Sequence, residues 1–429
     1  MKAMRWFYPG LGIKRWALLL SVGILVVGEG LAIASNSPFF GRLEYQVMNW
    51  ATSASGGAVG PMLAGALISL IGAGLCAAAI KRMMQSVLTA VYPGSAGSVT
   101  QILLHRHHLA RGPRIVVIGG GTGLSVLLRG LKEYTANITA IVTVADDGGS
   151  SGRLRREIGM LPPGDVRNCL VALADTEPLM ESLFQHRFTK GDLKGHSFGN
   201  LFLAAMTEMT GDFEEAVRQS SKVLAVRGRV LPSTLEDVTL CAVVDGGEVV
   251  RGETSIPRSG KGIHRVYLDP PAPAPLPEAL KAISEADAVI IGPGSLYTSI
   301  LPNLAVPRIV DAVRETRAAC VYVCNVMTQP GETDGYDASR HIHAVLDAMG
   351  GGGLDVVILN SETVPVKILD RYRESGAVPV TGGIDIPGVR VIRKPLVSRG
   401  DHARHDPSRL AGAVMDVIKA GKGLYVVLQ

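Results

Sequence analysis

The stretch Ile115-Val116-Val117-Ile118-Gly119-Gly120-Gly121-Thr122-Gly123 runs directly into Leu124-Ser125-Val126-Leu127-Leu128-Arg129-Gly130-Leu131. A β-branched run that breaks into glycines and then into apolar residues at helical spacing predicts a strand, a tight turn and a helix. Glycines let a backbone approach a phosphate closely, and the helix offers unpaired N–H groups and the positive end of its dipole. The loop residues Gly119, Gly120, Gly121, Thr122 and Gly123 are therefore candidate nucleotide-binding residues.

This loop differs from the two common phosphate-binding motifs. Leu124 stands where the dinucleotide motif has its third glycine, and the Lys-Ser/Thr ending of a P-loop is absent. A close-packed turn without a ligand is the alternative interpretation.

Further apolar runs alternate with helical patterns along the rest of the chain. The runs are Ile115–Ile118, Ile138–Val144, Val238–Val244, Ala288–Ile291, Val321–Val323 and Val356–Leu359. This alternation predicts an α/β fold, a Rossmann-like, doubly wound and mostly parallel sheet covered by helices. Ligands of such sheets bind where strands end and loops begin, so the loops should carry the function.

Composition narrows the classes of partner. The net charge is +5 and aromatic residues make up only 5% of the chain, and we find no basic stripe with interleaved aromatics, so we expect no nucleic-acid partner. Five scattered cysteines suit a reducing compartment.

Two apolar segments near the N-terminus predict a membrane anchor over residues 1–91. Residues 16–34 and 58–80 are each long enough to span a bilayer. Lys2, Arg5, Lys14 and Arg15 precede the first segment and Lys81 and Arg82 follow the second, whereas the loop between them holds Arg42 alone. The positive-inside rule then predicts a multi-pass protein of the cell membrane, with its main domain, residues 113–429, in the cytoplasm.

The two apolar segments and the linker after them allow further interpretations. Ala32-Ile33-Ala34 resembles a signal-peptidase site, so a cleaved signal peptide is the alternative to a first span. The second segment is rich in glycine, alanine and serine, which permits close helix packing, either with the first span or with another subunit. Residues 92–112 form the predicted linker, where Arg106, His107 and His108 suit contact with anionic lipid headgroups.

The loop after the second predicted strand contains several acidic and basic residues. Asp146 and Asp147 are candidates for a ribose, for a metal ion such as Mg²⁺ and for catalysis. Arg153 suits phosphate oxygens. A flexible polar turn would give the same pattern.

Two more loops begin apolar helices. Asp165 can cap the helix that follows it, while Arg167 and Asn168 in its first turn suit an anionic ligand. In Gly195-His196-Ser197-Phe198-Gly199-Asn200, His196 is either an acid–base group or a structural histidine, and Asn200 can donate to and accept from a base or sugar.

Loops after later strands complete the predicted site. Gly294 and Ser295 belong to a second glycine and hydroxyl turn that suits phosphate binding, although a plain helix cap is the alternative. Near the C-terminus, Arg404 could reach a diphosphate. One loop has the density of polar groups typical of ligand specificity, with Asn325, Thr328, Gln329, Glu332 and Thr333.

The motifs GGGTGLSVLLRGLK, TVADDGGSSGRLR, LPPGDVRNCLVALAD, KGHSFGNL, GPGSLYTSILPNL and NVMTQPGETDG together resemble the gluconeogenesis-factor family, also called YvcK-like. The wider superfamily includes the 2-phospho-L-lactate transferases called CofD, which transfer a phospholactyl group from a guanylyl diphosphate donor to a deazaflavin alcohol. The resemblance covers residues 114–429 and implies a nucleotide-diphosphate cleft on a Rossmann-like sheet. Residues 1–112 depart from the many family members that lack membrane spans.

For the YvcK-like branch, the resemblance implies binding of UDP-sugars, especially UDP-N-acetylglucosamine, and a role in carbon partitioning, cell-wall precursor supply and cell shape. It implies that Gly119–Gly123 and Asn200 hold the nucleotide, and that Asp146, Asp147 and Arg153 lie near the diphosphate or Mg²⁺. We expect a homo-oligomer with a partner in cell-wall or carbon metabolism.

Three functions therefore compete. The first is a membrane-tethered nucleotide-sugar sensor without turnover, the second a CofD-like phosphotransferase using Mg²⁺, and the third an NAD-dependent oxidoreductase. The incomplete dinucleotide motif weakens the third.

Overall fold

The computed structural model describes residues 13–35, 60–91, 107–175, 178–382, 386–398, 400 and 402–427, together with positions 41, 45, 46, 49 and 53. The chain divides into two compact units, Met1–Arg106 and His107–Gln429. Several predicted features lie outside the described residues: the basic residues Lys2 and Arg5, Arg42, residues 58–59 of the second span, and linker residues 92–106. Residues 107–112 group with the second unit, where the carbonyl of Leu109 accepts a 2.9 Å hydrogen bond from the Ala136 N–H.

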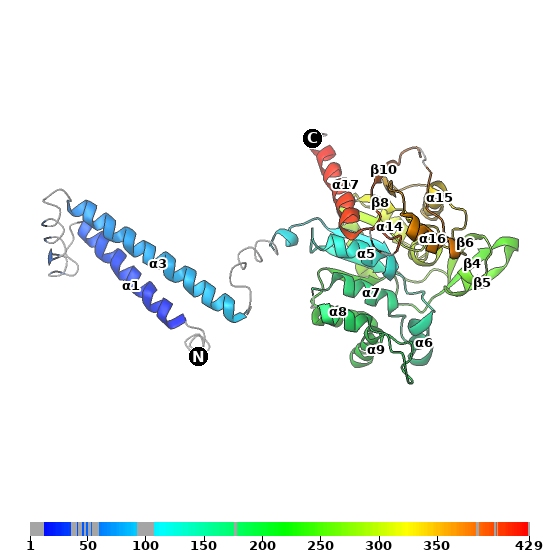
Figure 1. The fold of residues 1–429 in the computed structure, drawn as a ribbon, viewed down its shortest axis with the longest axis horizontal. Helices are drawn as coiled ribbons and strands as arrows, with labels where there is room; N and C mark the ends of the chain where they lie inside the picture. Colours follow the sequence, from blue (N-terminus) through cyan, green and yellow to red (C-terminus); the bar gives the residue numbers. More distant parts are fainter. Residues whose placement is uncertain are drawn as a thin grey trace. The chain divides into compact units, whose positions relative to one another are not determined.

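The first unit contains a pair of antiparallel helices, α1 (Ile13–Ala34) and α3 (Pro61–Val91), shown in Figure 1. Glycines bring the two backbones together. A Cβ added at Gly30 would lie 2.5 Å from the Ser69 nitrogen, and one added at Gly65 would lie 2.4 Å from the Ala34 nitrogen. The small residues of the second span therefore pack against the first span, one of the two alternatives open from the sequence.

The outer surface of this helix pair is apolar. Lys14–Ala34 and Met62–Ser86 are long and apolar enough to cross a membrane, and only 17% and 22% of their most apolar windows are buried. Leu18, Leu25, Met62 and Leu70 are each at least 60% exposed. A core helix of a soluble protein would instead be mostly buried.

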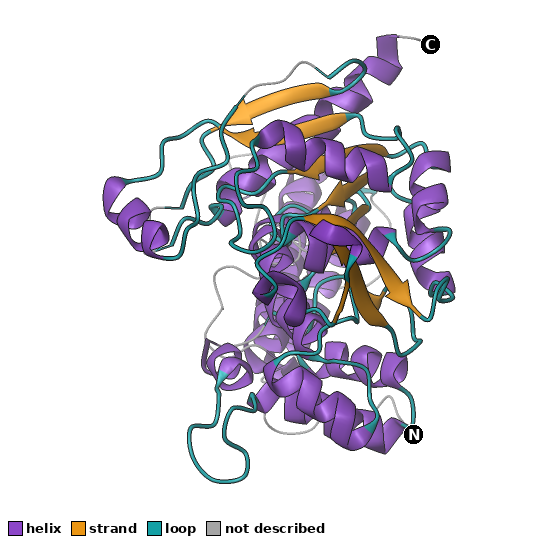
Figure 2. Ribbon diagram, turned by 90° about the vertical axis from the view of Figure 1, so that its right-hand side faces the viewer, coloured by secondary structure: helices purple, strands orange, loops and turns teal. Residues whose placement is uncertain are grey.

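The second unit is built on a seven-stranded parallel sheet with helices on both faces (Figure 2). Its strand order is β10-β9-β8-β7-β1-β2-β3. The strands are β1 (Ile115–Gly119), β2 (Ile138–Val142), β3 (Arg229–Pro232), β7 (Ala288–Ile291), β8 (Ala319–Val323), β9 (Val356–Asn360) and β10 (Arg390–Lys394). This is the predicted α/β fold.

The strand order changes direction at β1: β2 and β3 lie on one side of β1, and β7, β8, β9 and β10 lie on the other. Ile115 pairs with Ile138 of β2 on one side and with Ala288 of β7 on the other. The crevice between the loops after β1 and β7 is therefore the topological switch point, where open α/β sheets bind ligands.

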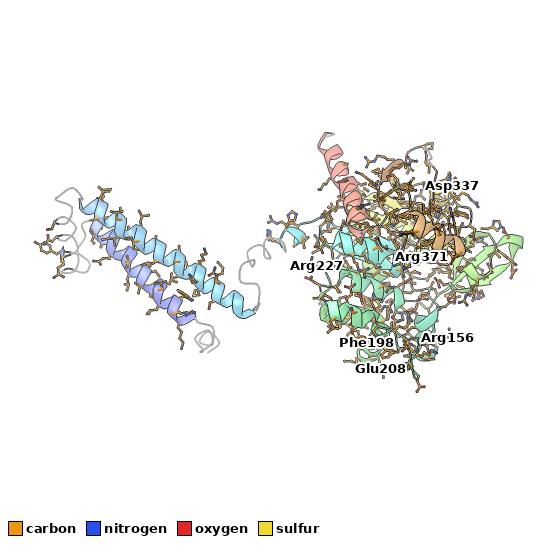
Figure 3. The ribbon with its side chains drawn as sticks, viewed as in Figure 1. Arg156, Phe198, Glu208, Arg227, Asp337 and Arg371 are labelled. Carbon is orange, nitrogen blue, oxygen red and sulfur yellow. The ribbon has the colours of Figure 1, made fainter. Side chains whose placement is uncertain are left out.

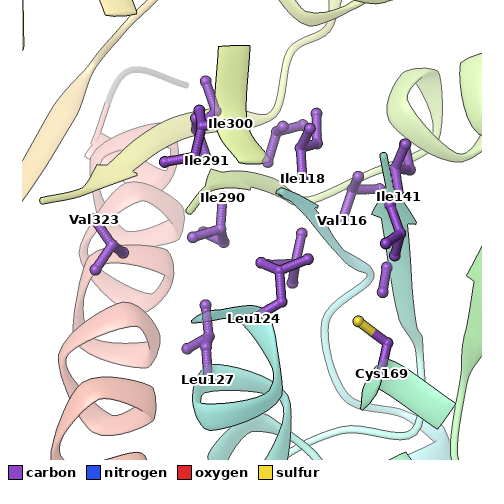
Figure 4. Packing of buried hydrophobic residues seen from close by; sticks show 14 of the residues in the cluster. Val116, Ile118, Leu124, Leu127, Ile141, Cys169, Ile290, Ile291, Ile300 and Val323 are labelled. Carbon is purple, nitrogen blue, oxygen red and sulfur yellow. The ribbon is translucent and has the colours of Figure 1, made fainter. Parts of the chain in front are cut away.

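The core lies beneath this point. Leu124 and Leu127, both fully buried on α5 (Gly121–Leu131), pack under β1 and β7 beside Ile290 (Figure 4). Leu124 occupies the position of the absent third glycine, and it fills the space between helix and sheet with an apolar side chain. A dinucleotide-binding loop uses glycine there to bring helix and strand closer.

The other helices among the described residues are α6 (Gly149–Ile158), α7 (Gly164–Leu173), α8 (Pro178–Gln185), α9 (Phe198–Thr210), α10 (Phe213–Val223), α11 (Ser255–Arg258), α12 (Pro277–Ser284), α13 (Leu301–Leu304), α14 (Ile309–Glu315), α15 (Ala338–Ala348), α16 (Val366–Glu374) and α17 (Pro407–Val427). A π-helical turn, η3 (Leu296–Ile300), precedes α13, and a 3₁₀ turn, η2 (Asp245–Gly247), follows β4.

One predicted strand belongs to a different sheet. The run Val238–Val244 forms β4 (Thr239–Val244), which pairs antiparallel with β5 (Val249–Arg251) and β6 (Ile263–Asp269) in a separate three-stranded sheet. The expectation that this run joins the parallel sheet is wrong, because β3 (Arg229–Pro232) takes the place next to β2. An apolar run alone does not identify its pairing partner.

Candidate functional site

A cavity of about 410 Å³ opens at the carboxyl ends of β1, β7 and β8. Its volume falls within the range usual for small-molecule sites. The cavity is lined by Thr122, Gly123, Val126, Asp146, Asp165, Glu253, Pro293, Gly294, Ser295, Ser299, Asn325, Val326, Met327, Thr328, Gln329, Tyr372, Ala403, Arg404 and His405. Predicted loops from distant parts of the sequence thus meet at the switch point.

The glycines of the first loop pack against protein. A Cβ at Gly121 would lie 2.5 Å from the Asp165 Cα, and one at Gly123 would lie 2.2 Å from the Pro293 carbonyl oxygen. Gly120 likewise abuts Ser299, and Gly119 abuts Leu124. The glycines therefore let three loops approach one another, and the approach of a phosphate to this backbone stays a prediction.

The cavity receives the N-terminus of α5. Gly120 precedes the first helical residue, and no side chain caps this end. Thr122 and Gly123, in the first turn, line the cavity. A helix N-terminus favours an anion through its N–H groups and its dipole.

Three carboxyl groups line the same cavity. Burial, reinforced by Asp146, raises the pKa of Asp165 to about 7. Burial, reinforced by Asp146 and Asp165, raises the pKa of Glu253 to about 8. The pKa of Asp146 is also raised by burial, although its carboxylate accepts a 2.9 Å hydrogen bond from the Gly148 N–H.

Asp147 does not line the cavity. Its Oδ1 accepts from the Thr254 N–H at 2.9 Å and from the Thr254 hydroxyl at 2.5 Å. Asp147 thereby holds the loop that carries Glu253. Glu253 was not predicted from the sequence, because its loop follows a strand of the small sheet, which was not predicted either.

Asp165 also differs from its expected role. Pro163 is the N-cap of α7 and no side chain caps this helix, whereas the Asp165 carboxyl accepts from the Gly121 backbone. Asp165 thus connects α7 to the glycine loop.

Within the described part of the chain, no three His, Cys, Asp or Glu side chains form a metal-binding group. Mg²⁺ commonly takes only one or two carboxylates and completes its shell with water and substrate phosphates. Asp146 and Asp165 fit this smaller requirement, because both line the cavity.

Other predicted residues form a buried polar cluster next to these loops. Ser150 accepts from the Asn200 amide at 3.1 Å and lies 3.0 Å from His196 Nδ1. Burial lowers the pKa of His196. Neither His196 nor Asn200 lines the cavity, and Asn200 Oδ1 is buried without a partner among the described residues.

Arg153 and Arg167 both donate hydrogen bonds to protein groups, although the Arg167 Nε is buried without a partner among the described residues. Arg153 donates to the Lys194 carbonyl at 2.8 Å. Arg167 donates to Ser197 and, at 2.7 Å, to Asn168 Oδ1. None of Arg153, Arg167 and Asn168 lines the cavity.

The residues predicted for specificity divide into two groups. Asn325, Thr328 and Gln329 line the cavity, whereas Glu332 and Thr333 lie behind it. Glu332 accepts from the Tyr297 N–H at 3.2 Å and the Thr298 hydroxyl at 2.9 Å, and the Thr333 hydroxyl accepts from the Gln329 N–H at 2.8 Å.

Asn325 and Gln329 are both oriented by the second glycine turn. The Asn325 amide donates to the Gly294 carbonyl at 2.8 Å and accepts from its N–H at 3.3 Å. The Gln329 amide donates to Ser295 at 2.6 Å, and its Oε1 is buried without a partner among the described residues.

The C-terminal part adds three polar side chains to the lining, those of Tyr372, Arg404 and His405. Arg404 is exposed at the cavity and makes no ion pair with any described residue. Tyr372, on α16, packs against a small apolar cluster that includes Met327 and Ala403. Tyr372 and His405 were not predicted, since a single aromatic residue and a buried histidine have no distinctive sequence pattern.

His405 is a neutral acceptor. Burial lowers its pKa to about 4, although its ring bonds to the Cys324 backbone. Its Nε2 is buried and has no partner in the described residues, so the bond to the Cys324 carbonyl comes from Nδ1–H. Nε2 then carries the free lone pair.

Comparison with known proteins adds a family assignment. Residues 115–397 match the family model described as 2-phospho-L-lactate transferase CofD. The chain is 55% identical over 312 residues to the gluconeogenesis factor of Bacillus subtilis, a match covering 72% of this chain and 98% of the relative. A crystal structure of a Bacillus halodurans protein matches with a TM-score of 0.69 and 51% identity, covering 71% of this chain and 100% of that one.

Some relatives share the N-terminal part as well. A Nostoc relative is 49% identical over 419 residues, 96% of this chain and 91% of the relative. Because residues 1–112 form more than a quarter of the chain, this match includes most of them.

Proposed function

This chain belongs to the 2-phospho-L-lactate transferase CofD family, and we propose that it binds a UDP-sugar, UDP-N-acetylglucosamine above all, as a regulator. In this proposal it adjusts carbon partitioning, cell-wall precursor supply and cell shape during gluconeogenic growth. Named gluconeogenesis factors among its relatives support the general role.

The polar groups that line the cavity favour a nucleotide sugar as the ligand. The cavity combines donors for an anion with two buried acceptors that lack partners among the described residues, Gln329 Oε1 and His405 Nε2. An unpaired buried acceptor costs about 1–3 kcal/mol, so a ligand that donates to it gains affinity. A nucleotide sugar carries both a diphosphate and hydroxyl or amide donors.

The anionic part of the ligand would lie between the N-terminus of α5 and Arg404. The face of Tyr372 offers a surface on which a nucleobase can stack. Asp146, Asp165 and Glu253 would repel a diphosphate if all three were ionised. Bound protons or a Mg²⁺ ion would remove that repulsion.

We also propose that α1 and α3 cross the bacterial cell membrane, with the second unit in the cytoplasm. Their apolar exposed surface supports this, as do Lys14 and Arg15 at one end of α1 and Lys81 and Arg82 in the last part of α3. The close packing of α1 against α3 supports a retained first helix over a cleaved signal peptide. The ligand-binding unit would then be tethered to the membrane where cell-wall precursors are used.

The second candidate function is a CofD-like transfer of a phospholactyl group from a guanylyl diphosphate donor. A carboxyl whose pKa is about 7, that of Asp165, suits a general base. It would take the proton of an acceptor hydroxyl as that oxygen bonds to phosphorus and the phosphoanhydride bond breaks, releasing GMP. A Mg²⁺ ion held by Asp146 would supply charge neutralisation at the diphosphate and would leave Asp165 free to act as the base.

Calorimetric titration of the full chain in detergent tests both candidates. UDP-N-acetylglucosamine, GDP, a phospholactyl-guanylyl donor and NAD are titrated, followed by product analysis with Mg²⁺ and a deazaflavin alcohol. Micromolar UDP-sugar binding without product supports the regulator, and product formation supports the transferase. Selective NAD binding contradicts both.

Matched variants locate the ligand. Arg404→Ala and Gln329→Ala should each weaken UDP-sugar binding about tenfold or more, which corresponds to about 1.4 kcal/mol. Arg156→Gln, on α6 (Figure 3), is the control, because Arg156 does not line the cavity. Unchanged affinity in the two cavity variants would remove the proposed site.

A further inference from the structure

A second groove, of about 500 Å³, lies beside the π-helical turn η3. It lies between β6 and α15, with α13 contributing to its floor. The lining residues are Ile263, His264, Arg265, Val266, Tyr297, Leu301, Leu304, Ala305, Tyr336, Arg340, His343, Ala344, Asp347 and Ala348. No residue lines both this groove and the first cavity.

The floor of the groove is apolar and firmly packed. Ile263, Tyr297, Leu301 and Leu304 are each at most 6% exposed. The Tyr297 hydroxyl lies 2.8 Å from that of Tyr336. The groove is therefore preformed and has an apolar floor.

The rim of the groove carries two exposed arginines. The Arg340 guanidinium stacks 4.0 Å from the centre of the Tyr336 ring, and that of Arg265 lies 5.6 Å from the Tyr267 ring. Neither guanidinium forms an ion pair with a described residue. Asp347 is the one acidic lining residue, and His264 is paired with Asp245 at 2.9 Å. Stacked, unpaired guanidinium groups are suited to phosphate or carboxylate.

The turn η3 connects this groove to the first cavity. Ser295 and Ser299 line the cavity, while Tyr297 and Leu301 line the groove. The Ser299 and Ile300 N–H groups both donate to the Ser295 carbonyl, at 3.0 and 2.9 Å. Glu332 fixes the turn through Tyr297 and Thr298. Single π-helical turns are frequent at functional sites.

We propose that this groove binds a small anion with a ring-sized apolar part, an effector whose binding stabilises η3 and so alters the first cavity. The apolar part lies on the Leu301 and Leu304 floor, and the anionic group is bound by Arg265 and Arg340. The groove does not depend on the proposed nucleotide-sugar function, whereas the consequence for ligand affinity rests on it.

Phenyl phosphate is the probe for this groove, with inorganic phosphate and phenol as the two partial ligands. We expect the full chain to bind phenyl phosphate at least tenfold more tightly than either. Arg340→Gln and Arg265→Gln should each weaken binding about tenfold, while Arg404→Ala and Arg156→Gln leave it unchanged. Loss of binding in Arg404→Ala alone, equal affinity for inorganic phosphate, or no binding of phenyl phosphate overturns the proposal.

Hydrogen exchange tests the connection without relying on UDP-sugar binding. Phenyl phosphate should slow exchange of the Ser299 and Ile300 amides several-fold in the unaltered protein and not in Arg340→Gln. Unchanged exchange at saturating probe overturns the connection. If these results hold and UDP-N-acetylglucosamine does not bind, the groove stands and the proposed function fails.

Discussion

Gly123 and Pro293 join the two glycine turns of the parallel sheet. A Cβ on Gly123 would lie 2.2 Å from the Pro293 carbonyl oxygen and 2.6 Å from the Gly294 Cα. These atoms belong to the backbone and cannot move aside cheaply. The contact fixes the loop after β1 against the loop after β7, and both loops line the cavity.

Gly123→Ala should therefore force the two turns apart. Overpacking of this kind typically costs about 1–3 kcal/mol, and we expect a loss of stability in that range. Thermal denaturation and UDP-sugar titration of the full chain measure it, and ligand affinity should fall with stability. Gly352→Ala is the matched control, since a Cβ there meets no atom within 4 Å. Equal stability of the two variants would contradict the role of the contact.

The parallel sheet could be predicted from the sequence because its central strands are continuous apolar runs. Ile115–Gly119 and Ala288–Ile291 are buried at every position. Strand β10 (Arg390–Lys394) was missed because it is a sheet edge with partly exposed residues, and β3 (Arg229–Pro232) because it is short and ends in proline. Edge strands lack the apolar run that identifies a buried strand.

The candidate site could be predicted only as a set of loops. The sequence indicates that the segments near Gly123, Asp146, Ser295 and Gln329 follow strands, and these residues do line one cavity. Which side chain of a loop faces the cavity depends on tertiary hydrogen bonds. Asp147, adjacent to Asp146, instead accepts from Thr254, more than a hundred residues away in the chain.

Asp147→Ala should release the loop that carries Glu253. The variant loses both hydrogen bonds from Thr254, and a bond to a charged group is worth about 1.5–3 kcal/mol. We expect faster hydrogen exchange over residues 252–256, measured by mass spectrometry. Asp147→Asn retains an acceptor oxygen and should exchange nearly as slowly as the unaltered protein. Identical exchange in Asp147→Ala would show that other contacts hold this loop.

Asp165 should make stability depend on pH. Its folded pKa of about 7 lies above the ordinary aspartate value of 3.8, so the folded state holds a proton that the unfolded state loses. The stability that this group contributes is complete below about pH 4 and is lost as pH rises through 7. Asp165→Asn keeps the shape and an acceptor for Gly121 but cannot ionise. It should be more stable than the unaltered protein at pH 8, by up to about 4 kcal/mol, and no more stable at pH 4.

Thermal denaturation between pH 4 and 8 measures this difference. Glu208→Gln, on α9 (Figure 3), is the control, because Glu208 is exposed. It should leave the pH profile unchanged. Parallel profiles for Asp165→Asn and the unaltered protein would show that the Asp165 carboxyl titrates as it does in the unfolded chain.

Substitutions at Gly30 and Gly28 of α1 can distinguish an effect on helix packing from an effect on membrane insertion. A Cβ at Gly30 would lie 2.4 Å from the Ser69 hydroxyl oxygen and 2.7 Å from the Gly65 carbonyl oxygen, whereas one at Gly28 meets no atom within 4 Å. Gly30→Leu should therefore push α1 away from α3, and Gly28→Leu should not. Both variants keep α1 equally apolar, so any difference between them reports packing.

The thiol of Cys76 provides the measurement. It is half-buried on α3 near the Leu20 carbonyl, while the other four cysteines are buried in the second unit. Opening the α1–α3 contact exposes it, so a membrane-permeant maleimide should label Cys76 several-fold faster in Gly30→Leu than in Gly28→Leu. Equal rates in the two variants would mean that α1 and α3 do not pack along these glycines in the membrane.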